Sequence, residues 1–282
     1  MTVTTRDETL LLDAAQLGVR VYAARPVLLD TPLVLHLHAG AFVSGSLDMG
    51  RTVSTLLAEA GAVVISADYP LAPQSVFPQT LQTLFQALTL ISQKRGKWAG
   101  RKSQIYVGGE EAGGNLAAGL ALMVRDQRSL ALAGQILLSP MLDACLATES
   151  VRLAEAGPVG CKWADGWHQY LGTADKACHP YAAPLGSSRL GGLAPALIVT
   201  AEDDPMRDES LAYAKRLRAA AVAVQDHVLP APTEWPCALA EADSLNADWA
   251  AGLRERFTEF FAGTASLLCP ASTSGPLKVP QT

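Results

Sequence analysis

Short apolar and β-branched runs alternate along this chain with longer amphipathic stretches. This alternation is typical of strands that lie parallel in one sheet, because each parallel neighbour requires a crossover connection, usually a helix. The predicted strands are 18–24, 32–38, 62–68, 104–109, 134–139, 195–201 and 222–229. The predicted helices are 47–61, 79–94, 112–126, 208–220 and 238–261. The pattern therefore predicts an α/β fold with a doubly wound, mostly parallel sheet and helices on both faces.

The chain of 282 residues, 49% hydrophobic and 17% charged, is large enough for one core. We expect a single domain over residues 1–262. The segment 143–172 is too long for an ordinary strand-to-helix connection and carries Trp163, Trp167 and Tyr170, so we expect a small helical lid there. Residues 263–282 are rich in Pro, Ser, Thr and Gly and are predicted to form a flexible tail.

Composition excludes several classes of function. The net charge of -5 and the scattered Lys and Arg residues offer no basic surface, so nucleic acid is not an expected partner. The N-terminus lacks a secretory pattern, and no apolar run reaches the roughly 18 residues of a membrane span, which predicts a cytoplasmic protein without membrane contact. The five cysteines form no C-x-x-C pair, so neither a zinc site nor a disulfide framework is predicted.

The strongest local motif is GGEEAGGNLAAGLAL, which directly follows the strand QIYV. A glycine-flanked residue between a strand and a helix is how α/β hydrolases present their nucleophile. Glu111 stands at the apex, with Gly109 and Gly113 as the small neighbours that such a tight turn requires. The turn is therefore predicted to be present, with a carboxylate where a hydroxyl would be expected.

A second motif, LHLHAGAFVSGSLD, follows the strand 32–38 and is similar to the HGGGF loop of lipases and esterases. In that loop, backbone N–H groups form the oxyanion hole, and we expect the N–H groups of Gly40, Ala41 and Ala112 to do so here. Alanine can resist the positive φ that glycine adopts, so the hole could be distorted, and a tight loop of purely structural origin is the alternative. His36 and His38 are expected to be structural rather than a metal pair, since no third ligand is nearby.

Two more segments complete an ordered set of matches, SADYPLAPQSVFPQT and HPYAAPL, the second followed by APALIVTAEDDPMRDESLAYAKRL. Together they resemble the bacterial hormone-sensitive-lipase-like esterases over about 34–217. The resemblance implies an α/β-hydrolase fold, and it maps the acid of the catalytic triad onto Asp204. The family's histidine segment corresponds to VLPAPTEWP, which sets Glu234 at the histidine position and leaves His227 within the preceding strand.

The predicted catalytic set is therefore Glu111, Asp204 and Glu234. His38, Phe42, Glu110 and Trp235 flank these motifs and are expected to contact substrate. Two of the three parts of a serine esterase are replaced, so conventional esterase activity is not expected. Three carboxylates in one pocket resist simultaneous ionisation, so they need a shared proton, a cation or partners elsewhere.

Several functions stay open at this point. Glu111 and Glu234 could act as an acid/base pair on a small carbonyl-containing substrate, with the oxyanion N–H groups polarising its oxygen. The chain could instead be an inactive pseudo-hydrolase that binds a small ligand or a partner protein. Weak ester hydrolysis with Glu111 as the nucleophile is a third reading. No cofactor is predicted, although a divalent cation between the carboxylates is conceivable, and the resemblance makes a homodimer plausible.

The family also carries an N-terminal cap ahead of the oxyanion loop. Only 35 residues precede His36 here, too few for that cap together with the first strands. We therefore expect a pocket that is more open, or one that a partner subunit closes.

Overall fold

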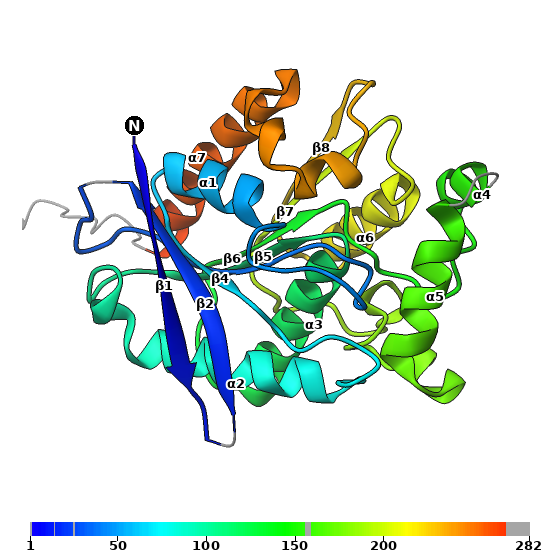
Figure 1. Cartoon of the computed structure of the whole chain (residues 1–282), viewed down its shortest axis with the longest axis horizontal. Coiled ribbons are helices and arrows are strands. Elements are labelled where there is room, and N and C mark those ends of the chain that lie inside the picture. The colour runs from blue at the N-terminus through cyan, green and yellow to red at the C-terminus, as the bar shows by residue number, and fades with distance from the viewer. Residues whose placement is uncertain (1, 14, 25, 156–158, 269–282) are drawn as a thin grey trace, which may run out of the picture.

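The sheet is the centre of the molecule (Figure 1). The computed structural model describes residues 2–13, 15–24, 26–155 and 159–268. In these residues eight strands form one sheet in the order β1-β2-β4-β3-β5-β6-β7-β8. The strands are β1 (Val3–Leu11), β2 (Gln16–Ala24), β3 (Leu33–Leu37), β4 (Val63–Ala67), β5 (Ile105–Glu110), β6 (Gly134–Leu138), β7 (Ala196–Ala201) and β8 (Val224–Leu229). Strands β3 to β8 pair in parallel, whereas β2 pairs antiparallel with both β1 and β4.

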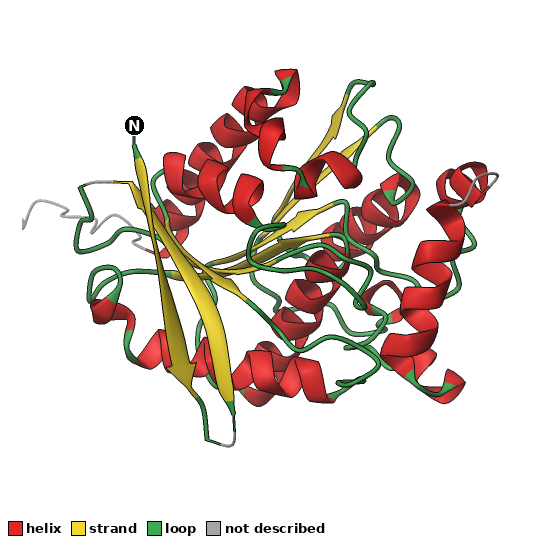
Figure 2. Cartoon of the chain, viewed as in Figure 1, coloured by secondary structure: helices red, strands yellow, loops and turns green. Residues whose placement is uncertain are grey.

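Helices cover both faces of this sheet (Figure 2). They are α1 (Arg51–Glu59), α2 (Gln79–Gln93), α3 (Ala112–Gln127), α4 (Glu149–Glu155), α5 (Val159–Leu171), α6 (Arg207–Ala219) and α7 (Asp248–Leu268). Short 3-10 turns occupy Arg95–Lys97, Ala174–Cys178, Pro184–Gly186, Cys237–Ala240 and Ala242–Asn246. One buried cluster joins α2, α3 and α6 to the sheet, and a second joins α1 and α7 to its other face. The predicted doubly wound, mostly parallel sheet is confirmed.

None of the helices in the described ranges is both long enough and apolar enough to cross a membrane. The central strands β3, β4, β6 and β7 are buried along their whole length, which explains their continuous apolar sequences.

The differences from the predicted elements lie at the two ends of the chain. Strand β1 was not predicted, because most of its side chains face water and its sequence VTTRDETLL shows no apolar period. The predicted helix 238–261 is two 3-10 turns followed by α7, which begins at Asp248. Helix α7 also continues to Leu268, so the first part of the predicted tail is helical, and 269–282 lie outside the described residues.

The segment predicted as a lid contains α4 and α5, with residues 156–158 outside the described ranges. Figure 1 shows both helices on the side of the molecule away from the β1–β2 pair. Aromatic residues on α5 pack on Phe42, whose ring stacks on Tyr170 at 4.1 Å and lies 5.0 Å from Trp167. A Cβ atom at Gly166 would lie 2.1 Å from the backbone oxygen of Ala41, so the helix and the loop before α1 touch directly.

Glu209 fixes the start of the connection that leads from β6 to this lid. Its Oε2 accepts the N–H groups of Leu142 at 2.6 Å and Asp143 at 2.8 Å. Its Oε1 is buried and has no hydrogen-bond partner in the described part of the chain. Burial raises the pKa of Glu209 from 4.5 to about 8, more than the two N–H donors lower it. The folded state therefore holds a proton on Glu209 at neutral pH.

Glu209→Gln should change how stability depends on pH. The raised pKa gives the wild type a stabilising contribution that is complete below pH 4.5 and is lost as pH rises through about 8. Glutamine mimics the protonated form, so the variant should gain on the order of 2–4 kcal/mol relative to the wild type between pH 5 and pH 8. Urea unfolding at pH 5, 6.5 and 8 measures this difference, and parallel pH profiles for the two proteins would contradict it.

Candidate functional site

Glu111 lies in the tight turn between β5 and α3. Its backbone has φ 53° and ψ −114°, a conformation that residues with a side chain rarely adopt. A Cβ atom at Gly109 would lie 2.4 Å from the oxygen of Leu37, and one at Gly113 would lie 2.0 Å from the same atom. The glycines are therefore required for the close approach of β3, and Glu111 occupies the apex of the turn that the motif predicts.

The loop after β3 places two backbone N–H groups opposite this apex. Gly40 has φ 131°, and Ala41 and Phe42 follow with φ 49° and 68°. Alanine at position 41 thus takes the positive φ that the loop requires. The N–H groups of Gly40 and Ala41 converge on one atom, Oε2 of Glu111, at 2.6 Å and 2.8 Å. The oxyanion donors predicted at these two positions bind the carboxylate of the chain itself.

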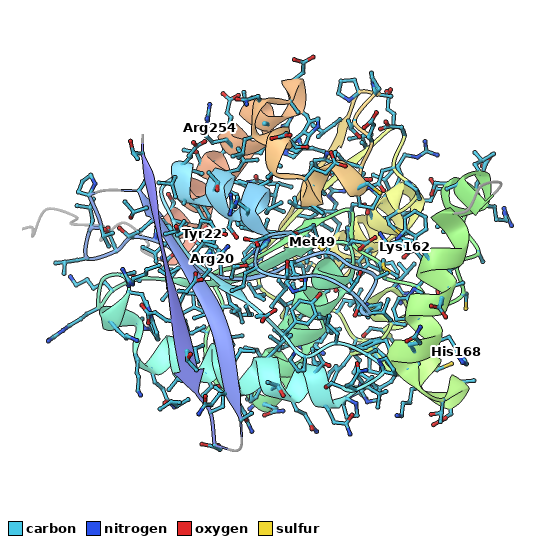
Figure 3. All side chains as sticks on the ribbon, in the orientation of Figure 1. Arg20, Tyr22, Met49, Lys162, His168 and Arg254 are labelled. Atoms are coloured by element: carbon cyan, nitrogen blue, oxygen red, sulfur yellow. The ribbon has the colours of Figure 1, made fainter. Side chains whose placement is uncertain are left out.

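The other oxygen of Glu111 binds the lid. Oε1 accepts a hydrogen bond from the indole N–H of Trp163 at 2.7 Å and another from the ammonium group of Lys162 at 3.1 Å. Both residues lie in the first half of α5, and Figure 3 marks Lys162 where α5 meets the body of the protein. Trp163 was singled out only as a lid aromatic, and no motif pointed to Lys162. A single Lys in an amphipathic helix gives no indication in the sequence of which carboxylate it will contact in the folded protein.

The surroundings hold Glu111 in its ionised form. Burial alone would raise the pKa of Glu111, which is 1% exposed. The charge of Lys162 and the N–H groups of Trp163, Gly40 and Ala41 outweigh this effect and lower the pKa below its ordinary value. A buried carboxylate with four donors is electrostatically satisfied, so it has little tendency to take up a proton at neutral pH.

Glu110, predicted to contact substrate, is completely buried and is used inside the fold. Its Oε2 lies 2.7 Å from Nε2 of His36, and its Oε1 accepts the N–H of Ala39 at 3.2 Å. The other ring nitrogen of His36 lies 3.2 Å from Ser66 Oγ and 3.1 Å from Ser54 Oγ. Glu110 therefore joins β5 to β3 and to the start of the oxyanion loop.

His38 also supports this loop. Its ring stacks on Tyr69 with 4.2 Å between centroids, and its Nδ1 lies 2.7 Å from the oxygen of Ala39. The hydroxyl of Tyr69 donates to the backbone oxygen of His38 at 2.7 Å. Burial lowers the pKa of His38, so its imidazole is neutral. Among the described residues no group of three or more His, Cys, Asp or Glu is placed to hold a metal ion.

Asp204, predicted as the acid of the triad, is buried at the carboxyl ends of β6 and β7. Its Oδ1 accepts the hydroxyl of Ser139 at 2.7 Å and the N–H of Met206 at 2.8 Å, and its Oδ2 accepts the hydroxyl of Thr200 at 2.5 Å. Burial raises the pKa of Asp204 to about 6 despite these donors. No contact joins Asp204 to Glu234 in the described residues.

Asp203, which was not predicted as a site residue, holds the backbone at the predicted histidine position. It accepts the N–H groups of Thr233 at 2.6 Å and Glu234 at 3.0 Å, and also the Thr233 hydroxyl at 2.7 Å. Glu234 itself is exposed and has φ 59°. Trp235 is buried, with its ring edge-on to Trp249 at 5.4 Å.

The structure thus brings together part of the predicted site and adds two residues to it. Glu111, Gly40 and Ala41 are in direct contact, and Lys162 and Trp163 join them. Ala112 begins α3 and is not among the described donors to Glu111. Predicted site residues outside this contact group are His38, Phe42, Glu110, Asp204, Glu234 and Trp235.

Comparisons with known proteins agree with this architecture. The sequence profile of a family described as alpha/beta hydrolase fold matches residues 34–232. An arylesterase from Saccharolobus solfataricus is 33% identical over 218 residues, which cover 76% of this chain and 70% of the relative. An ethyl acetate hydrolase from Pseudomonas putida is 35% identical over 229 residues, covering 78% of this chain and 71% of that protein.

Solved structures give the same result. The crystal structure of a thermostable esterase from Pseudomonas putida superposes with a TM-score of 0.80 at 28% identity, and covers 92% of this chain and 83% of its own. Fold, profile and relatives agree, and the chain therefore belongs to the α/β-hydrolase fold family, as an esterase-like member.

Proposed function

We propose that this esterase-like chain is a catalytically silent hydrolase, in which Glu111 replaces the nucleophile and permanently occupies the oxyanion hole. The scaffold then serves to bind a small ligand or a partner protein rather than to cleave esters. This proposal selects one of the functions that the sequence leaves open. It rests mainly on the position of a single atom, Glu111 Oε2.

That atom stands where an ester would have to place its carbonyl oxygen. Ester hydrolysis in this fold needs the backbone N–H groups of the hole to stabilise the oxyanion of the tetrahedral intermediate. Here the N–H groups of Gly40 and Ala41 are bound to Glu111 Oε2 at 2.6 Å and 2.8 Å. A substrate can reach them only when Glu111 leaves, and its departure would remove the carboxylate from the attacking position.

The contacts also disfavour Glu111 as a covalent nucleophile. Both carboxylate oxygens accept two hydrogen bonds, one pair from the loop and one pair from α5. These bonds draw electron density from the oxygens and lower the pKa of the group, and a weaker base is a weaker nucleophile. The geometry that stabilises this anion therefore makes it less reactive.

An acid/base pair of Glu111 and Glu234 receives no support from the described contacts. A general acid must carry a proton near neutral pH, whereas the pKa of Glu111 is lowered. Glu234 is exposed, and its hydrogen bonds in the described structure are made by its backbone, to Asp203 and from Ala238. Of the functions considered, binding without turnover fits these observations best.

Hydrolysis of a short-chain p-nitrophenyl ester tests the proposal directly. The wild type and Glu111→Ala should hydrolyse the ester at the same rate, because neither offers an activated nucleophile at the apex. The double variant Glu111→Ser, Glu234→His should be at least about tenfold faster than the wild type, because it empties the hole and supplies a hydroxyl and an imidazole.

The single variant Glu111→Ser empties the hole and supplies the hydroxyl without the imidazole, so comparing it with the double variant isolates the effect of the base. Circular dichroism confirms that every variant is folded. Wild-type turnover that Glu111→Ala abolishes would show that the carboxylate is catalytic and would refute the proposal.

Glu111→Gln should destabilise the protein at neutral pH. The amide would turn an NH₂ group toward the donors of α5 or of the loop, leaving buried donors unpaired at a cost of about 1–3 kcal/mol. Because the folded pKa of Glu111 is lowered, the wild type's advantage is present above pH 4.5 and is lost as pH falls through that lowered pKa. Urea unfolding at pH 7 and pH 4 measures both effects.

The exposed Glu255→Gln serves as the matched control for loss of one negative charge. Equal losses in the two variants would mean that the contacts of Glu111 contribute nothing specific.

A further inference from the structure

We infer that the site is a carboxylate receptor shared between the oxyanion loop and the lid, with Glu111 as its built-in ligand and small monocarboxylates as the class it accepts once Glu111 is removed. The inference rests on the proposed function, and it adds the chemical identity of what the site binds. The receptor consists of the N–H groups of Gly40 and Ala41, the indole N–H of Trp163 and the ammonium group of Lys162.

The arrangement of the donors matches a carboxylate. Two donors from the loop meet one oxygen at 2.6 Å and 2.8 Å, and two donors from α5 meet the other at 2.7 Å and 3.1 Å. An ester or amide carries a single carbonyl oxygen and cannot accept from both sides equally. Charge-assisted bonds to both oxygens of an anion are also stronger than neutral ones, so the receptor should discriminate by charge as well as by shape.

The two donors from α5 have no other hydrogen-bond acceptor among the described residues. Trp163 is completely buried, and its indole N–H donates to Glu111. Within the described ranges Glu111 is the acidic partner of Lys162, at 3.1 Å. Removing the carboxylate would leave the buried indole N–H of Trp163 without an acceptor, whereas the ammonium group of Lys162, 41% exposed, would be solvated by water. The unpaired buried N–H carries a free-energy cost that a small anion in its place would remove.

The size of the site is fixed by the contact between α5 and the loop. A Cβ atom on Gly166 would lie 2.1 Å from the oxygen of Ala41, so the helix and the loop are already as close as they can be. The four donors close on one carboxylate group, that of Glu111. Glu111→Ala removes a CH₂–CO₂⁻ group, and acetate is the free molecule that replaces it.

Acetate binding to Glu111→Ala is the test. A ligand of four non-hydrogen atoms is expected to bind with a Kd in the millimolar range, about 1–10 mM. Acetate at 50 mM should then raise the Tm of Glu111→Ala by about 3 °C relative to chloride at equal ionic strength. It should leave the Tm of the wild type unchanged, because the receptor is already filled.

Acetamide, which has the same shape and no charge, should have no effect on the variant. Adding Lys162→Met to Glu111→Ala should weaken acetate binding about threefold, a modest loss because the ammonium group is partly exposed. Hydrogen exchange should show faster exchange in α5 for Glu111→Ala than for the wild type, and acetate should slow it again.

Equal effects of acetate on Glu111→Ala and on the wild type, or equal effects of acetate and acetamide, would overturn the inference. Glu111→Ser is tested in parallel, and a variant that refolds in acetate and not in chloride supports the inference as well. These outcomes do not depend on ester hydrolysis. A wild type that turns esters over refutes the silent hydrolase, whereas failed acetate binding refutes only the receptor.

Discussion

One buried negative charge joins three segments that are distant in the sequence. The carboxylate of Glu111 links the turn after β5, the loop after β3 and the helix α5, and each segment supplies or holds part of its hydrogen-bond shell. The loop keeps its positive φ angles at 40–42 with its N–H groups satisfied, and α5 keeps its buried indole N–H satisfied. Without an anion at this point, these N–H donors would be buried and unpaired. The packing of α5 against the loop after β3 therefore depends on the Glu111 carboxylate.

Glu111, Asp204 and Glu209 are almost equally buried and differ in their ionisation. The pKa of Glu209 rises to about 8 and that of Asp204 to about 6, whereas the pKa of Glu111 is lowered. Among the described contacts, Glu209 and Asp204 accept from neutral N–H or O–H donors, and of these three carboxyl groups Glu111 is the one with a positively charged partner, Lys162. Burial therefore does not set the charge of a carboxyl group by itself; the charge of its partners decides the sign of the shift.

The sequence predicts the scaffold better than the site, for a physical reason. Strands such as β3 and β7 are apolar along their whole length because both faces of the sheet are covered. Gly109 and Gly113 are required because a side chain at either position would collide with the backbone of Leu37. These are local signals. The partner of Glu111 on α5 is set by how a distant helix packs, so nothing in the sequence near Lys162 could reveal it.

The same reasoning explains why the contacts of Asp203 were not predicted. Asp203 and Asp204 are adjacent and chemically identical, yet one points to the loop at 233–234 and the other into the sheet. Only the course of the backbone separates them. Strand β1 was not predicted because it lies at the edge of the sheet with most of its side chains in water. Such a strand needs no apolar face, so its sequence carries no apolar pattern.

The short tether of Glu111 has a consequence for how this site responds to its surroundings. A carboxylate joined to the backbone by two methylene groups, on a turn with fixed φ, binds its donors intramolecularly and pays no translational entropy, an advantage that dissolved acids lack. The four donors are therefore already occupied by the chain itself. At neutral pH the occupancy of this site changes only through movement of the chain itself, so dissolved carboxylic acids do not compete for the centre of this molecule.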